Sequence, residues 1–139
     1  MRIEPFRAWH LPAIDPLHLR AGSAGTATLE YGRFCETSGP AFSAIDGDRV
    51  IASAGIIVGS PHGNWLWSYL RQDSRKHFVA FHRATARFLD TYRMPLLAGT
   101  EMAYQPGCRW LEMLGFKRGE PLSDLYPAEV GSWVYRRGM

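Results

Sequence analysis

The sequence predicts an α+β fold, with a mixed, mostly antiparallel sheet, one parallel β-α-β crossover and helices on both faces of the sheet. The antiparallel part follows from an Asp-Gly turn at residues 46–48 between two apolar runs, with a third run after a second turn. The crossover follows from a long amphipathic stretch at residues 73–92 that lies between two apolar segments. A length of 139 residues is suited to a single domain, residues 1–139, with one substantial core.

The N-terminal 40 residues predict one strand and two helices. Residues 2–8 can form the strand, and residues 9–14 read as a turn that enters a helix, with Pro12 acceptable only in its first turn. Residues 26–37 carry a weaker helical pattern, which predicts that Leu29, Phe34 and Cys35 face inward. A Ser-Gly-Pro sequence at residues 38–40 ends this helix.

Three consecutive antiparallel strands are predicted next. Residues 41–45 and 49–58 flank the Asp-Gly turn, and residues 59–64 form a second turn before a strand at residues 65–70. In this third strand Trp65, Trp67 and Tyr69 alternate on one face. Such a stripe could stack nucleic-acid bases, but the core face of a sheet is the favoured interpretation.

Residues 73–92 are predicted to form the main helix. Its apolar face repeats at steps of three and four residues and consists of Phe78, Phe81, Thr85, Phe88, Leu89 and Tyr92. Either Asp73 or Ser74 can serve as its N-cap, and Pro95 lies beyond its end. Residues 96–100 then form a short buried strand, so this strand and the strand at residues 65–70 should be parallel neighbours.

The last part of the chain predicts a short helix at residues 106–114 and two strands, at residues 116–117 and 131–136. Gly115 stands where a left-handed helix cap is needed, because glycine has no Cβ to oppose that conformation. If Gly115 is the first residue past the cap, Phe116 can pack back on Leu111.

The sequence RWLEMLGF at residues 109–116 resembles the ending a-x-x-(F/L)-(Y/L)-e-x-L-G-F of the GNAT acyl-CoA N-acyltransferase superfamily. The predicted order of elements over residues 2–136 is also that of the GNAT fold, while the motif resemblance covers residues 65–117. The resemblance implies a GNAT-like domain that transfers an acetyl group from acetyl-CoA to a primary amine of a small molecule or a protein.

In GNAT proteins a loop written (Q/R)-x-x-G-x-(G/A) holds the pyrophosphate of acetyl-CoA on backbone N–H groups at the start of the main helix. The matching residues here are 75–80, where Arg75 and Ala80 fit the ends of the motif and Phe78 replaces the middle glycine. A benzyl group at this position could block a close approach of phosphate. The residues that the resemblance assigns to cofactor binding are Tyr69, Leu70, Arg71, Arg75, Lys76, His77 and Phe78.

The resemblance also bears on catalysis, because many GNAT enzymes protonate the departing thiolate with a Tyr four residues before the glycine of the G-F pair. That position is Leu111 here, and Tyr104 is the candidate substitute. Glu101, after the strand at residues 96–100, is the candidate base that deprotonates the amine. The expected acceptor cleft lies between the strands at residues 65–70 and 96–100.

A second function class is a GNAT-fold protein that has lost catalysis and serves as a binding or assembly module with a protein partner. The short length, Phe78 and Leu111 favour this alternative. The Trp-rich, glycine-poor form of the motif also resembles small GNAT-like proteins encoded by tailed phages, some of them associated with virion assembly. A homodimer is compatible with either class.

Composition narrows the remaining classes. Apolar residues make up 46% of the chain and aromatic residues 13%, which excludes disorder, and the net charge of +3 does not by itself imply nucleic acid. The N-terminus lacks a signal-peptide core and the longest apolar run is too short to span a bilayer, so a cytoplasmic protein without a membrane partner is expected.

Cys35 and Cys108 have no zinc-binding spacing; they could form a disulfide, but a reduced pair is the simpler expectation. Histidine spacing predicts no metal site, and Cys108 is expected to be structural rather than nucleophilic.

Overall fold

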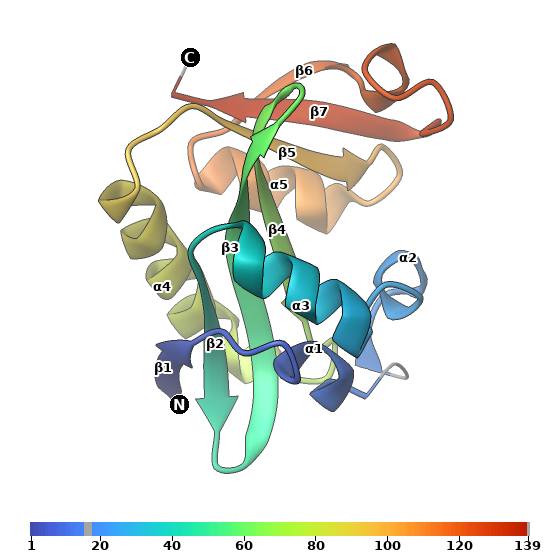
Figure 1. Cartoon of the computed structure of the whole chain (residues 1–139). Helices are drawn as coiled ribbons and strands as arrows, with labels where there is room; N and C mark the ends of the chain where they lie inside the picture. Colours follow the sequence, from blue (N-terminus) through green and yellow to red (C-terminus); the bar gives the residue numbers. More distant parts are fainter. Residues whose placement is uncertain (16–17, 139) are drawn as a thin grey trace. The chain divides into compact units, whose positions relative to one another are not determined.

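A computed structural model describes residues 1–15 and 18–138 of the chain (Figure 1). The elements in chain order, with η for a 3₁₀ helix, are β1 (Arg2–Pro5), α1 (His10–Ala13), α2 (Ala21–Ala24), α3 (Leu29–Ser38), β2 (Ala41–Asp46), β3 (Arg49–Ser60), β4 (Gly63–Leu70), η2 (Arg75–His77), α4 (Phe78–Thr91), β5 (Leu96–Glu101), α5 (Gln105–Met113), β6 (Lys117–Pro121), η3 (Leu122–Asp124) and β7 (Ser132–Arg137).

The strands of the described residues pair in the order β1-β2-β3-β4-β5-β7-β6. Pairing is antiparallel between β1 and β2, β2 and β3, β5 and β7, and β6 and β7. β4 and β5 are parallel, with Asn64 opposite Leu96 and Trp65 opposite Leu97. The predicted crossover is therefore confirmed, because the helix α4 joins two parallel neighbours.

The chain divides into two compact units. The first unit comprises Met1–Ile57 and Trp67–Thr91, and the second comprises Val58–Leu66 and Tyr92–Met139.

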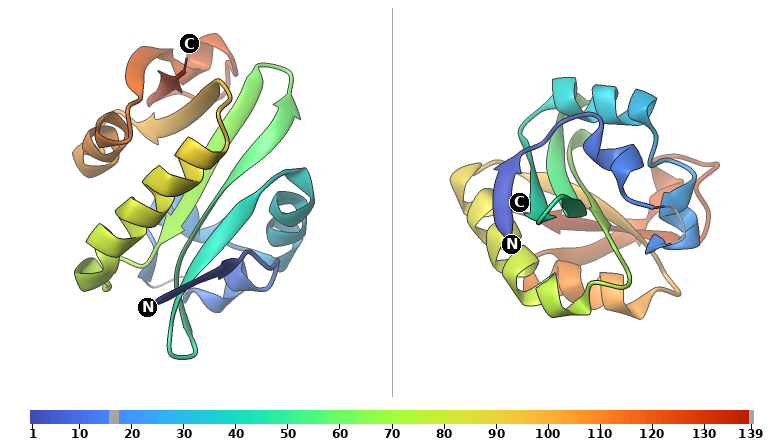
Figure 2. Two further views of the ribbon diagram at one scale, coloured as in Figure 1. Left: turned by 90° about the vertical axis from the view of Figure 1, so that its left-hand side faces the viewer. Right: turned by 90° about the horizontal axis from the view of Figure 1, so that it is seen from below.

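In the first unit the sheet is covered on both faces. Seven consecutive residues of β3, 50–56, are buried, which is the pattern of a strand without a solvent-facing side. Helices α1 and α3 lie on one face and α4 on the other (Figure 2). The expected helices on both faces are thus present here.

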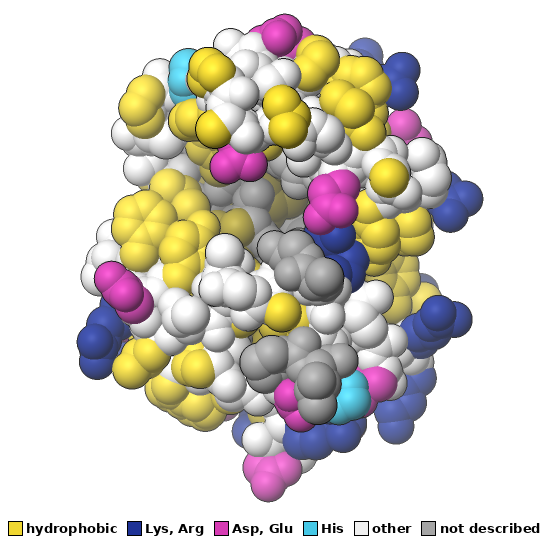
Figure 3. Space-filling view, turned by 90° about the vertical axis from the view of Figure 1, so that its right-hand side faces the viewer, with side chains coloured by type: hydrophobic (Ala, Val, Ile, Leu, Met, Phe, Trp, Pro, Cys, Tyr) yellow, Lys and Arg dark blue, Asp and Glu magenta, His cyan; other side chains and the backbone are white. Residues whose placement is uncertain are grey.

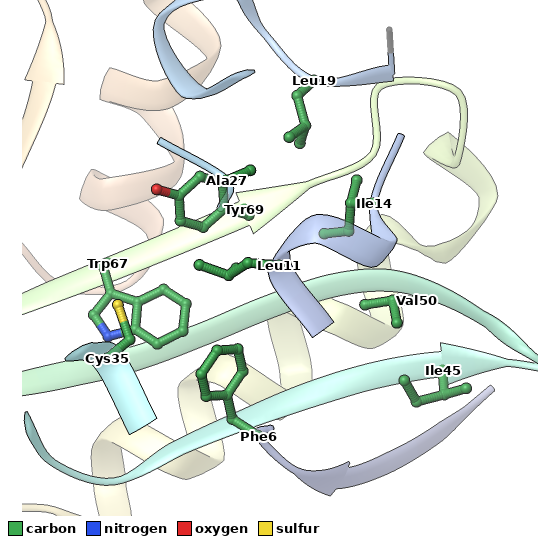
Figure 4. Packing of buried hydrophobic residues seen from close by; sticks show 10 residues of the cluster. All are labelled: Phe6, Leu11, Ile14, Leu19, Ala27, Cys35, Ile45, Val50, Trp67 and Tyr69. Atoms are coloured by element: carbon green, nitrogen blue, oxygen red, sulfur yellow. The ribbon is translucent and has the colours of Figure 1, made fainter. Parts of the chain in front are cut away.

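The core on the α1 and α3 side is built around aromatic rings (Figure 4). The ring of Phe6 packs edge-on against Trp67 with centroids 5.1 Å apart, and Trp67 lies 6.1 Å from Tyr69. Leu11, Ile14, Cys35 and Ile45 are among the buried residues around them. The core-facing interpretation of the aromatic stripe in β4 is therefore confirmed for Trp67 and Tyr69.

The helix α3 differs from its predicted orientation. Cys35 is buried as expected, but Leu29 and Phe34 are 40% and 49% exposed. The cause is Gly32, where an added Cβ would lie 2.9 Å from the carbonyl carbon of Ala8 and closer still to its oxygen. Close approach at Gly32 fixes this glycine and Cys35 on the buried face, so Phe34 is turned outward.

The N-terminal strand and the main helix are both shorter than predicted. β1 ends at Pro5, and the backbone then turns so that the Arg7 N–H donates to Nδ1 of His10. After β4, residues 71–74 are not helical, the 3₁₀ turn η2 follows, and α4 starts only at Phe78. Ser74 occupies the N-cap position but its side chain makes no capping bond. The predicted apolar face is buried at Phe81, Thr85 and Leu89, whereas Tyr92 is exposed.

The Asp-Gly turn between β2 and β3 is confirmed. Asp46 pairs with Arg49, and Gly47 has a φ of 64°, the left-handed conformation that favours glycine in such turns.

In the second unit, β7 pairs with β5 along six residue pairs, from Leu96 opposite Arg137 to Glu101 opposite Ser132. The helix α5 ends as predicted: Gly115 has a φ of 92°, its N–H donates to Glu112 O at 3.0 Å, and the Phe116 N–H donates to Leu111 O at 2.9 Å. These two bonds define a Schellman cap.

Candidate functional site

The residues that the sequence assigned to cofactor binding form one continuous segment of the first unit, from the end of β4 to the start of α4. Tyr69 is buried, and Leu70 is the last residue of the strand. The Arg71 N–H then donates to Ile51 O at 3.0 Å, which fastens the chain to β3 as it leaves the sheet. The helical turn at Arg75 therefore starts from a fixed position.

Arg71 is committed to a carboxylate. It is only 9% exposed, and its Nε and Nη2 each lie 2.9 Å from one carboxylate oxygen of Asp73. This bidentate hydrogen bond holds the pKa of Asp73 well below its usual range. His18 Nδ1 lies 3.4 Å from the same carboxylate. Arg71 therefore stabilises the loop through Asp73, and its charge is already paired.

His77 is also paired, since its Nε2 lies 3.0 Å from Oδ2 of Asp46 at the end of β2. The bond to His77 lowers the pKa of Asp46. The side chains of Arg75 and Lys76, in contrast, are exposed, and neither side chain makes a hydrogen bond or ion pair with the described residues. Among the predicted basic residues, these two are the ones available to an anionic ligand.

The start of this helical segment fits an anion. Neither η2 nor the first turn of α4 contains an acidic residue. The N–H of Phe78 donates to Arg75 O inside the 3₁₀ turn, and the His77 N–H donates to Ser74 O at 3.0 Å. The amides of Arg75 and Lys76 precede these bonds, and a helix offers such first donors no internal acceptor.

Phe78 neither enters the core nor remains fully exposed. Its side chain is half-buried, and its ring stacks on that of His82, one turn later, with centroids 6.2 Å apart and an angle of 26°. The candidate phosphate donors are the amides of Arg75 and Lys76. They lie three and two residues before Phe78, which stands where the GNAT motif has its middle glycine.

The predicted catalytic residues lie together in the second unit. Glu101 is the last residue of β5 rather than following it, and Tyr104 is the N-cap of α5. A backbone bond of 3.0 Å from Tyr104 N–H to Glu101 O joins them in one tight turn. The side chain of Glu101 is exposed and that of Tyr104 is half-buried.

Leu111 and Cys108 of α5, and Tyr135 of β7, are buried. Leu111, at the position of the family's acid, is buried, and its carbonyl accepts the cap bond from Phe116. Cys108 is buried as well, with Sγ 3.8 Å from Glu101 O. Burial, together with a hydrogen bond to Cys108, raises the pKa of Tyr135 to about 12. Both cysteines are free thiols.

Metal and membrane features are missing from the part of the chain that the structure describes. No group of three or more His, Cys, Asp or Glu side chains in residues 1–15 and 18–138 is arranged to hold a metal ion. Acidic side chains are spread over the face shown in Figure 3. None of the described helices is long and apolar enough to cross a membrane.

The first unit also carries a surface groove that the sequence did not reveal. It has a volume of about 460 Å³ and is lined by Gly25, Thr26, Thr28, Glu30, Tyr31 and Phe34; we call it the α3 groove. It is joined to β4 by a hydrogen bond of 2.5 Å between Thr26 Oγ1 and Tyr69 OH.

Comparison with solved structures identifies the fold. The ribosomal-protein-alanine N-acetyltransferase from Brucella melitensis superposes with a TM-score of 0.73 at 16% identity, covering 99% of both chains. The ribosomal-protein-S18-alanine N-acetyltransferase from Escherichia coli gives 0.69 at 15% identity, covering 98% of this chain and 92% of that one. The aminoglycoside 6'-N-acetyltransferase from Enterococcus faecium gives 0.62 at 15% identity, covering 99% and 96%.

The chain has the GNAT fold. No family model matches the sequence, and a search of curated proteins finds no match. The GNAT likeness therefore lies in the arrangement of the elements, which covers nearly the whole chain, and not in close sequence identity.

The contacts of the candidate site differ in how far the sequence could have revealed them. Asp73 stands two residues after Arg71, so their pairing was visible as a local charge pattern. Asp46 and the α3 groove had no such signal, because His77 is 31 residues from Asp46 and Tyr69 is 43 residues from Thr26. Both contacts join segments that are far apart in the sequence, so they form only in the folded chain.

Proposed function

We propose that this protein is an N-acetyltransferase that uses acetyl-CoA as co-substrate and a primary amine, on a small molecule or a protein, as acceptor. The solved structures with the same fold are acetyltransferases by name and act on aminoglycosides or on a ribosomal-protein alanine. The proposed reaction is also compatible with the expected cytoplasmic location and with a homodimer.

The observation that carries the proposal is the cationic start of the η2–α4 segment. Arg75 and Lys76 are exposed there, and no acidic residue occupies the first turn. Cations near a helix N-terminus are each unfavourable by roughly 0.3–1 kcal/mol, because the helix dipole is positive at that end. A bound pyrophosphate would offset this cost and would also accept bonds from the first amides.

In the proposal each candidate residue has a distinct role. The amide groups and side chains of Arg75 and Lys76 bind the cofactor phosphates, while Arg71 and Asp73 hold the loop. Glu101 accepts the proton of the attacking amine, directly or through water. The new C–N bond forms as the C–S bond of the thioester breaks, and Tyr104 donates a proton to the departing thiolate. Backbone donors of β4 polarise the thioester carbonyl.

The test is an acetyl-transfer assay that detects the free thiol of CoA with a panel of primary amines. Glu101→Gln should lower kcat by about 10²-fold or more, which is the usual contribution of a general base. Glu112→Gln, an exposed glutamate on α5, is the matched control and should leave the rate unchanged. Equal rates in the two variants would remove Glu101 from the mechanism.

A second candidate function is a non-catalytic GNAT-fold binding or assembly module with a protein partner, including one of phage origin. Leu111, buried at the position of the family's acid, is the observation that favours it. Such a module predicts no thiol release with any amine and no effect of Arg75→Ala on its partner binding. The acetyl-transfer assay and a titration with acetyl-CoA distinguish the two functions.

A further inference from the structure

The wall of the α3 groove is aromatic. The rings of Tyr31 and Phe34 are 5.7 Å apart and inclined by 30°, so they form one stacked surface at a three-residue spacing along the helix. Tyr31 is half-buried and Phe34 is largely exposed. Aromatic faces of this kind attract both apolar groups and organic cations. The volume of about 460 Å³ lies within the usual range of small-molecule sites, roughly 300–1,000 Å³.

The charge of the groove lining is negative. Glu30 is the charged residue of its lining, and no Lys or Arg lines it. The Glu30 carboxylate makes no hydrogen bond or ion pair with the described residues. Thr26 and Thr28 add hydroxyl groups beside it. The lining is complementary to a cationic donor and unfavourable for an anion.

The groove is also connected to the strand that matters for the reaction. Thr26 Oγ1 lies 2.5 Å from the hydroxyl of Tyr69, the penultimate residue of β4. Thr26 is further fixed by its bond to Ser23 O at 3.1 Å. A ligand in the groove is therefore held beside the strand whose backbone is proposed to polarise the thioester.

From these features we infer that the α3 groove selects the acceptor as a small organic amine that carries an apolar or aromatic group next to a protonated nitrogen. Glu30 binds an ammonium group, and the Tyr31–Phe34 surface packs against the apolar part. The identification of this ligand as the acceptor rests on the proposed acetyltransferase function; its binding in the groove does not.

The experiment is a titration of the isotope-labelled full chain, followed by backbone amide NMR signals, with 2-phenylethylamine as the probe. Two further probes separate its parts: 2-phenylethanol lacks the charge and butylamine lacks the ring. Saturable shifts at residues 26–34 with 2-phenylethylamine, and weaker affinity for both analogues, are the expected result. Shifts confined to other parts of the chain would overturn the inference.

Two variants assign the contributions. Glu30→Gln should weaken 2-phenylethylamine about fivefold, the effect of an exposed ion pair, and leave 2-phenylethanol unchanged. Phe34→Ala should weaken both ring-containing probes. Both side chains are exposed, so the fold should survive, which circular dichroism checks. Glu129→Gln, an exposed glutamate outside the groove, is the control. An unchanged affinity of the amine for Glu30→Gln would contradict the assignment.

A separate titration with acetyl-CoA distinguishes a failure of the groove inference from a failure of the acetyltransferase proposal. If the amine binds in the groove and acetyl-CoA does not bind, the groove inference stands and the acetyltransferase proposal fails. If acetyl-CoA binds and no probe enters the groove, the groove inference fails and the acetyltransferase proposal stands.

Discussion

At the scale of single residues, His10 has an environment that fixes the tautomer of its neutral ring. It is 2% exposed, its Nδ1 accepts the Arg7 N–H at 3.0 Å, and Ser43 Oγ lies 2.8 Å from the same nitrogen. Ser43 in turn lies 2.7 Å from Ser53, so the imidazole ties α1 to two buried strands. Since Nδ1 must accept a bond, the neutral ring carries its proton on Nε2.

This environment predicts a pH dependence of stability. Burial lowers the pKa of His10, against the opposing effects of Glu4 and Glu36, so the unfolded chain binds more protons than the folded one as the pH falls below about 6.5. The free energy of unfolding should therefore decrease from pH 7 to pH 5. Urea denaturation of His10→Gln should show a smaller decrease over this interval than the parent chain, whereas His62→Gln, at an exposed turn, should retain the full decrease.

At the scale of elements, the packing of α3 depends on Gly32. A Cβ at this position would meet the Ala8 backbone, which is unable to move without shifting the chain that enters α1. Gly32→Ala should lower the free energy of unfolding by about 1–3 kcal/mol, as expected for overpacking. Gly25→Ala is the matched control, because no atom lies within 4 Å of its Cβ position and its φ is −72°. Similar stability of the two variants in urea denaturation would contradict this packing.

The cap of α5 gives a second prediction for an element. Gly115→Ala should cost about 1 kcal/mol, because alanine is disfavoured at a φ of 92°. Gly115→Asn should cost less, since asparagine tolerates the left-handed conformation better. Thermal unfolding measures both, and an unchanged midpoint for Gly115→Ala would show that the cap adds nothing.

At the scale of the whole molecule, the sequence predicted the elements better than their faces. The Asp-Gly turn, the parallel pair of strands and the cap at Gly115 are each set by local chemistry, and all three are confirmed. The outward turn of Phe34 was predicted wrongly, because its apolar spacing competes with a close contact between Gly32 and the distant Ala8. Contacts of this kind exist only once the chain has folded.

The candidate site stays a prediction. The segment from Tyr69 to Phe78 was assigned to cofactor binding from its resemblance to the GNAT phosphate loop, and in the structure it runs from the end of β4 to the start of α4. The sequence could not predict which basic side chains of this segment are paired. His77 pairs with Asp46 at the end of β2, which is 31 residues away in the sequence. The roles of Glu101 and Tyr104 stay predictions.

The most direct test of the central claim is calorimetric titration of the unmodified chain with acetyl-CoA. We expect binding with a Kd in the micromolar range, weakened at least about fivefold in Arg75→Ala through the loss of one charge contact. Arg87→Ala, an exposed arginine further along α4, should bind as the parent chain does. Absence of binding, or equal affinity of Arg75→Ala and Arg87→Ala, would contradict the claim that the start of the η2–α4 segment is the cofactor site.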